Sequence, residues 1–76
     1  MTSQQRLIEA AEKHGWEWRI TRPSRTLIMK REGVTVWVSF TADGKVRSGL
    51  FETPDGADRI NGGVPAIIDE LRRFGK

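Results

Sequence analysis

The alternation of apolar and polar residues predicts four consecutive strands between two helices. Trp16, Trp18 and Ile20 occupy every second position, which is the period of a strand with one buried face. The same period recurs in three further runs, whereas both ends of the chain carry apolar residues at the 3.6-residue spacing of an amphipathic helix. The strands are expected at 16–22, 25–31, 34–41 and 45–51, and the helices at 3–14 and about 64–74.

The turns between these runs fix which residues lie opposite each other. A two-residue loop at Glu32-Gly33 places Ile28 opposite Trp37, and a two-residue loop at Pro23-Ser24 places Trp18 opposite Met29. A three-residue loop with Gly44 in the left-handed conformation places Val46 opposite Phe40 and Trp37 opposite Gly49. The helix boundaries are marked by a capping box at Thr2 and Gln5, by Gly15, by Pro65 and by Gly75.

This register divides the sheet into one apolar and one mixed face. The apolar face contains Trp16, Trp18, Ile20, Leu27, Met29, Val34, Val36, Val38, Phe40, Val46 and Leu50. Each helix has one apolar stripe, so the simplest packing places both helices on that face. We therefore expect a single α+β domain over 1–76, in two layers, with a four-stranded antiparallel meander (α-β-β-β-β-α). Residues 52–63 are expected to form a long surface connection.

Composition limits the chemistry that this domain can perform. The chain has 76 residues, which is enough for one hydrophobic core. It has no cysteine and one histidine, His14, so we expect neither disulfides nor a metal site. We find no catalytic constellation, nucleotide fingerprint or cofactor motif, and we expect a protein that is not an enzyme. No signal peptide or membrane span is predicted, and the cysteine content is typical of a cytoplasmic protein.

The mixed face is the candidate interaction surface. In the predicted register Trp37, Ile28 and Phe51 lie together, and three cations surround them: Arg19, Lys30 and Arg47. Tryptophan, phenylalanine and arginine are typical of protein-binding hot spots, which predicts a host protein or a second copy of this chain as the partner. The alternative is that these side chains only stabilise the sheet through cross-strand pairs.

The arginines offer a second interpretation. The net charge is +3, and the basic residues cluster on the first hairpin and the mixed face, at Arg19, Arg22, Arg25, Lys30 and Arg47. Cations beside an aromatic platform can hold phosphates while bases stack, which predicts nucleic-acid binding as the alternative function. Gly62-Gly63 before the last helix, with Arg59 nearby, is a further candidate anion site, although two glycines also simply permit a tight entry into a helix.

The helix that ends in Gly15-Trp16, followed by a basic strand, resembles the start of the HicA-type toxins, α-β-β-β-α proteins related in fold to double-stranded-RNA-binding domains. The toxins carry a catalytic histidine in a Gly-Ser-His segment after the first strand. Here the corresponding residues are Pro23-Ser24-Arg25, so the resemblance implies at most a degenerate toxin or antitoxin component without ribonuclease activity.

The whole chain looks like the small accessory proteins of actinobacterial phages. The shared features are a helix ending in Gly15-Trp16, a meander rich in Trp, Arg and Thr, and a Gly-Val pair, Gly63-Val64, that opens the last helix. This resemblance implies a cytoplasmic protein made during infection that acts on a host component. The sequence therefore predicts a non-enzymatic macromolecular binding module that uses the open sheet face around Trp37.

Overall fold

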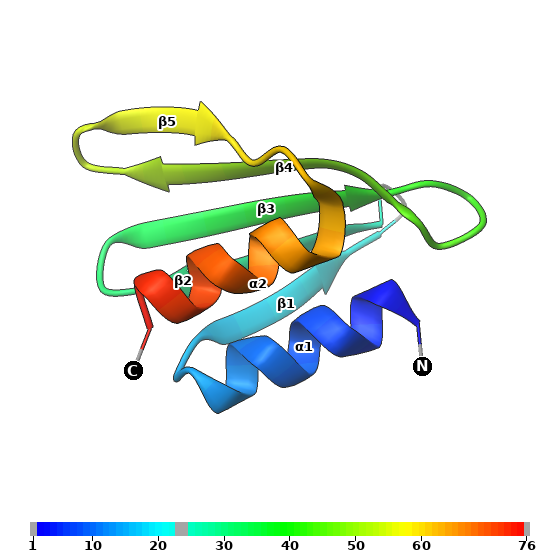
Figure 1. Ribbon diagram of the computed structural model, residues 1–76, viewed down its shortest axis with the longest axis horizontal. Coiled ribbons are helices and arrows are strands. Elements are labelled where there is room, and N and C mark those ends of the chain that lie inside the picture. Colours follow the sequence, from blue (N-terminus) through cyan, green and yellow to red (C-terminus); the bar gives the residue numbers. More distant parts are fainter. Residues whose placement is uncertain (1, 23–24, 76) are drawn as a thin grey trace.

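The computed structural model describes residues 2–22 and 25–75 and shows an α+β fold (Figure 1). Two helices flank five consecutive antiparallel strands, and the strand order in the sheet follows the sequence, β1-β2-β3-β4-β5. The elements are α1 (Ser3–Lys13), β1 (Glu17–Thr21), β2 (Thr26–Arg31), β3 (Val34–Phe40), β4 (Val46–Thr53), β5 (Gly56–Arg59) and α2 (Gly63–Arg73). The predicted helix–meander–helix order is confirmed, with one strand more than expected.

The first two hairpins have the predicted register. Trp18 pairs with Met29 in β1–β2, and Ile28 pairs with Trp37 in β2–β3. The β2–β3 turn has both central residues in the left-handed region, Glu32 with φ 47° and Gly33 with φ 83°, as a two-residue type I′ turn requires. The predicted Pro23-Ser24 loop lies outside the described residues, and the pairs on its β1–β2 hairpin agree with the expected register.

The third hairpin corrects the predicted register of β4. Phe40 pairs with Val46 as expected, but Ser39 pairs with Ser48, so Arg47 is the extra residue of a β-bulge. Beyond the bulge every residue of β4 is displaced by one position, so that Leu50 rather than Gly49 lies opposite Trp37. A one-residue displacement exchanges the two faces of a strand. Gly49 therefore faces the helices, and Leu50, predicted to be in the core, lies on the opposite face.

Space beneath α2 explains why this register is adopted. A Cβ atom added to Gly49 would lie 3.3 Å from Ile60 Cβ and 3.3 Å from Ile67 Cδ1, so even a methyl group would require these side chains to move by a few tenths of an ångström. The bulge places the glycine under α2. It also places Phe51 on the helix side, where its ring centroid lies 6.0 Å from that of Phe74.

Strand β5 lies within the segment that was predicted to be a surface connection. Thr53 pairs with Gly56 and Leu50 pairs with Arg59, which closes a tight β4–β5 hairpin. All four residues of β5 are exposed, so the strand shows no alternation of apolar and polar residues. Backbone pairing defines this strand, and hydrophobic periodicity therefore could not predict it.

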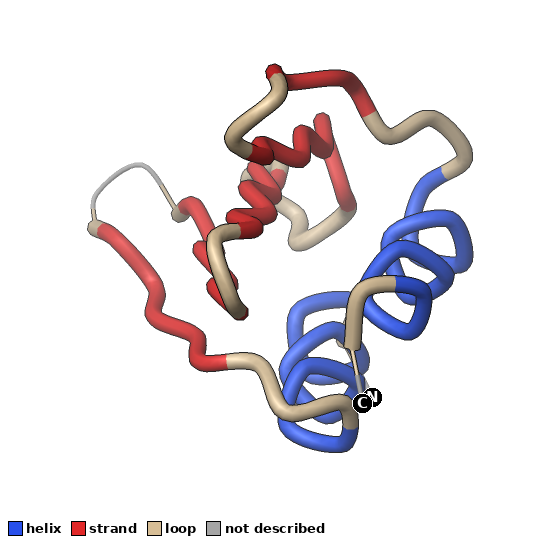
Figure 2. The backbone as a smooth tube through the Cα atoms, turned by 90° about the vertical axis from the view of Figure 1, so that its left-hand side faces the viewer, coloured by secondary structure: helices blue, strands red, loops and turns tan. Residues whose placement is uncertain are grey.

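Both helices cover one face of the sheet, as predicted (Figure 2). Leu7 and Ala11 of α1 and Ile67 and Leu71 of α2 are fully buried, and they belong to the same core as the inward side chains of β2 and β3. The buried core residues are Leu7, Ala10, Ala11, Trp16, Leu27, Met29, Val36, Val38, Phe40, Val64, Ile67 and Leu71. Neither helix is long and apolar enough in the described chain to cross a membrane.

Trp18 departs from its predicted place in the core. Its partner Met29 is fully buried, yet Trp18 is 40% exposed, because β1 is an edge strand with a neighbour on one side only. Trp16, in the connection between α1 and β1, is instead 4% exposed and donates a hydrogen bond from its indole nitrogen to the Leu71 carbonyl oxygen at 2.9 Å. This bond satisfies one of the carbonyl groups that the end of α2 leaves unpaired.

Candidate functional site

The centre of the candidate site is one row of five side chains that crosses the whole sheet on the face opposite the helices. The pairs Arg19–Ile28, Ile28–Trp37, Trp37–Leu50 and Leu50–Arg59 belong to successive hairpins and therefore lie side by side from β1 to β5. We call these five residues the Trp37 row. It has three apolar residues in the middle and one arginine at each end.

The middle of the Trp37 row is apolar although no helix of the described chain covers it (Figure 2). Ile28, on the strand between β1 and β3, is only 3% exposed. Trp37 is 37% exposed, and Leu50 is half-buried. Trp37 and Leu50 are neighbours and form a contiguous apolar strip with Ile28, and such a strip with an exposed indole is a candidate interaction surface.

Polar rows adjoin the Trp37 row on both sides. One side has the uncharged row Thr21, Thr26, Ser39 and Ser48. The other side has the row Glu17, Lys30, Thr35, Glu52 and Ala57. Two carboxylates therefore lie next to the apolar centre, one on β1 and one on β4. The face as a whole has only a small excess of positive charge.

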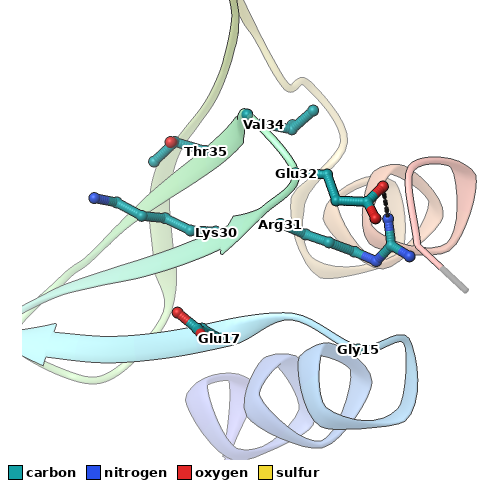
Figure 3. Close-up of a pocket in the computed structure, with 8 residues that line it drawn as sticks. Gly15, Glu17, Lys30, Arg31, Glu32, Val34 and Thr35 are labelled. Atoms are coloured by element: carbon teal, nitrogen blue, oxygen red, sulfur yellow. Dashed lines mark hydrogen bonds and ion pairs between the residues drawn. The ribbon is translucent and has the colours of Figure 1, made fainter.

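A hollow of about 280 Å³ opens beside Ile28. Its walls come from β1 and β2, and the residues that line it are Glu17, Trp18, Arg19, Ile28 and Lys30. A second hollow of about 380 Å³ shares Glu17 and Lys30 with the first and continues toward the β2–β3 turn (Figure 3). Together they form a shallow depression along the β1–β2 hairpin that reaches the apolar centre of the Trp37 row.

Alternation along β2 keeps the cations of this region apart. Figure 3 shows Lys30 and Arg31 pointing to opposite sides of the strand. Arg31 forms an ion pair of 2.8 Å with Glu32 and donates a second hydrogen bond to the Phe74 carbonyl oxygen at 3.3 Å. Arg31 therefore has a structural role at the end of α2, and Lys30 is the cation of β2 on the open face.

Four of the six residues predicted to bind a partner share the open face: Trp37, Ile28, Arg19 and Lys30. Phe51 does not, because the β4 bulge turns it to the helix side, opposite Val36 and against Phe74. Arg47 is the bulge residue itself and lies beyond the Ser39–Ser48 pair. The predicted platform of two aromatic rings is therefore wrong, and one indole remains.

The residues predicted to bind nucleic acid do not form a single surface. Arg19 and Lys30 line the hollow beside Ile28, whereas Arg22 and Arg25 line a different hollow with Gln4 of α1 and Phe40. Arg25 donates a hydrogen bond to the Ala42 carbonyl oxygen at 3.0 Å, which links the first hairpin to the β3–β4 turn. These arginines lie around the end of the sheet near the start of α1.

Two residues of the Trp37 row were missed by sequence reasoning, Leu50 and Arg59. Leu50 was assigned to the core because the bulge was not expected, and Arg59 was assigned to a loop because β5 lacks apolar residues. The signal available for Leu50 was Gly49, whose missing side chain marks a close approach of another element and hence the inward position of β4. No such signal pointed to Arg59, because every residue of β5 is exposed.

Other candidate chemistry is sparse in the part of the chain that the structure describes. No three histidine, aspartate or glutamate side chains gather there as metal ligands. Gly62 and Gly63 line a hollow of about 210 Å³ with Arg47 and Arg59 at the start of α2. Asp43 lies in the β3–β4 turn, where the Thr41 hydroxyl donates a hydrogen bond that lowers the pKa of the Asp43 carboxyl. That bond stabilises a turn.

Comparison with known proteins adds no assignment. No protein-family model, no curated protein and no solved structure matches the chain. The resemblances to phage accessory proteins and to HicA-type toxins therefore stay expectations from the sequence. The functional argument depends on the geometry of the open face.

Proposed function

We propose that this protein is a non-enzymatic binding module that engages a partner protein through the open face of its sheet. The observation that carries the proposal is the apolar centre of the Trp37 row, with Ile28 buried and Trp37 37% exposed on a face that no helix of the described chain covers. Burying an indole and a leucine together is a main source of binding energy in protein interfaces.

The surroundings of the row also support a protein partner. Protein interfaces typically have an apolar centre with little charge, enriched in tryptophan and arginine, and a polar rim. The Trp37 row has that composition, and threonines, serines and two glutamates border it. The hollow beside Ile28 gives a partner side chain a place to insert.

Nucleic acid fits the same face less well. Binding of single strands uses successive aromatic side chains along a basic groove. Here Phe51 is on the helix side, and Glu17 and Glu52 lie in the row next to Trp37. Arg22 and Arg25 line a separate hollow. A polyanion on this face would meet two carboxylates beside the single indole.

The test compares one variant of the open face with one variant of the helix side. Trp37→Thr removes the indole from the open face, and Arg6→Gln changes an exposed residue of α1 that lines the groove between the helices, away from that face. Threonine is chosen because it keeps a high preference for strands. Partners are captured from a lysate of the producing cell or its host, after nuclease treatment, and the affinity of the purified partner is measured for each variant.

We expect Trp37→Thr to weaken the purified complex at least tenfold, the loss typical of a central tryptophan, and Arg6→Gln to leave it within about twofold. Both variants should keep the far-ultraviolet circular dichroism spectrum of the parent. The capture is repeated without nuclease. A partner that is captured only without nuclease would assign the face to nucleic acid. A partner that binds both variants equally would show that the open face is not the binding surface.

A further inference from the structure

We infer that the partner presents an extended segment with one apolar residue at its centre and an acidic residue at each end, lying across the strands along the Trp37 row. This inference rests on the proposed function and specifies the ligand of the same face. Its basis is the arrangement of charge: the row begins with Arg19 on β1 and ends with Arg59 on β5, on either side of Ile28, Trp37 and Leu50.

Both arginines are available to a ligand. Within the described chain the ion pairs are Arg31–Glu32 and Arg72–Asp69, and neither includes Arg19 or Arg59. Both residues are exposed and lie on edge strands, where the guanidinium groups have water on one side. An arginine in this position forms two parallel hydrogen bonds with a carboxylate, which adds direction as well as charge.

The spacing of the strands sets the length of the segment. Neighbouring strands lie about 4.8 Å apart, so four intervals separate the backbones at Arg19 and Arg59 by roughly 19 Å. A segment in the extended polyproline II conformation advances about 3.1 Å per residue with three residues per turn, so roughly six residue steps cover the same distance and every third side chain points to the same side. The expected pattern is an acid, two residues, an apolar anchor, two residues and a second acid. The anchor lies over Trp37 and the hollow beside Ile28.

The same charges argue against the other occupants. A second copy stacked face to face would bring each arginine against itself, or would bring Arg19 against Arg59 at both ends of the row with Lys30 opposite Glu52 in the adjoining row. A nucleic acid carries a charge at every step and would pass Glu17 and Glu52, whereas the inferred segment has its charges only at the two ends. A segment with separated acids is therefore the occupant whose charges match.

The experiment measures binding of synthetic peptides to the whole protein by amide chemical shifts, which detect complexes up to millimolar dissociation constants. The first peptide has the pattern Glu-Ser-Thr-Phe-Thr-Ser-Glu between neutral ends. The second replaces both glutamates by glutamine, and the third places the glutamates next to the phenylalanine. An oligothymidine of matched length is titrated in parallel.

We expect the first peptide to shift the amide signals of Ile28 and the indole signal of Trp37, and to bind at least tenfold more tightly than the glutamine peptide. Arg19→Gln and Arg59→Gln should each lower that affinity about five- to tenfold. Their effects should multiply, because sites so far apart act independently. Arg6→Gln on α1 is the control and should change nothing, since Arg6 lines the groove between the helices.

Exchanging the charges between the protein and the peptide tests the assignment of the acidic ends by a gain of binding rather than by a loss. Arg19→Glu should weaken binding of the two-acid peptide, and a peptide with lysine at one end should recover most of that loss. Equal affinity for the glutamate and glutamine peptides, with binding still lost in Trp37→Thr, would overturn the acidic-end inference and leave the proposed function standing. Tighter binding of oligothymidine, or no ligand that depends on Trp37, would overturn both.

Discussion

Gly49 decides which side of β4 faces the helices. Its missing side chain leaves room for Ile60 and Ile67, each within 3.3 Å of where a Cβ atom would be. With Gly49 turned inward, Leu50 must lie on the open face beside Trp37, because neighbouring residues of a strand point to opposite sides. The candidate site and the packing of α2 thus depend on the same residue.

This dependence predicts the effect of Gly49→Val. Two methyl groups beneath Ile60 and Ile67 overpack the core, so the free energy of unfolding should fall by about 1–3 kcal/mol. Ser48→Val, one position away on the open face, is the matched control and should change it by less than about 0.5 kcal/mol. The free energy of unfolding of each variant is to be measured by urea denaturation. If Gly49→Val left that free energy unchanged and Ser48→Val lowered it, β4 would have no bulge.

At the scale of elements, the end of α2 is attached to the rest of the domain by side chains from two other segments. Trp16 donates to the Leu71 carbonyl oxygen at 2.9 Å, and Arg31 donates to the Phe74 carbonyl oxygen at 3.3 Å. These carbonyl groups have no partner within the helix, so the donors replace the hydrogen bonds that a helix end lacks. The Trp16 bond is the shorter and the more deeply buried of the two.

Trp16→Phe tests this attachment. The change removes the indole N–H and leaves a buried carbonyl group unpaired, which should cost about 1–3 kcal/mol. That is a large part of a total stability of about 4–11 kcal/mol for a chain of this size. Trp18→Phe, at the exposed edge, is the control and should shift the melting temperature little. Equal shifts in the two variants would mean that the Trp16 bond contributes nothing measurable.

The elements also show where sequence reasoning succeeds and where it stops. Turn chemistry at Glu32-Gly33 and apolar alternation in β1 to β3 gave the pairs Ile28–Trp37 and Trp18–Met29 correctly. The β4 bulge was missed because a pair between Phe40 and Val46 agrees with either register. Strand β5 was missed because its side chains are all exposed, so its position is determined by backbone hydrogen bonds to β4.

At the scale of the whole molecule, a two-layer fold has one sheet face that its own helices do not cover. Here the consequence is a row with apolar residues in the middle and like charges at its ends. If two copies stacked with a two-fold axis along the strands, Arg19 would oppose the partner's Arg59; with the axis along the row, Arg19 would oppose the partner's Arg19. Both arrangements place like charges together at the ends of the row; the first also brings Lys30 opposite the partner's Glu52 in the adjoining row. The arginines at the two ends therefore oppose self-association and leave the apolar centre to a different partner.

Reversing one end of the row should therefore convert the face into a self-complementary one. In Arg19→Glu, the two-fold axis along the strands pairs each new carboxylate with Arg59 of the second copy, which gives two ion pairs in place of two repulsive contacts. We expect the dimer dissociation constant to fall about five- to thirtyfold, equivalent to roughly 1–2 kcal/mol, and the effect to shrink at high salt. Sedimentation velocity at about 0.05 and about 0.5 M salt measures the dimer fraction of the variant and of the parent, and so gives both the change in the dissociation constant and its dependence on salt. Arg6→Glu makes the same charge change on the helix side and should leave self-association as it is in the parent; if it dimerises equally, net charge rather than the geometry of the Trp37 row controls association.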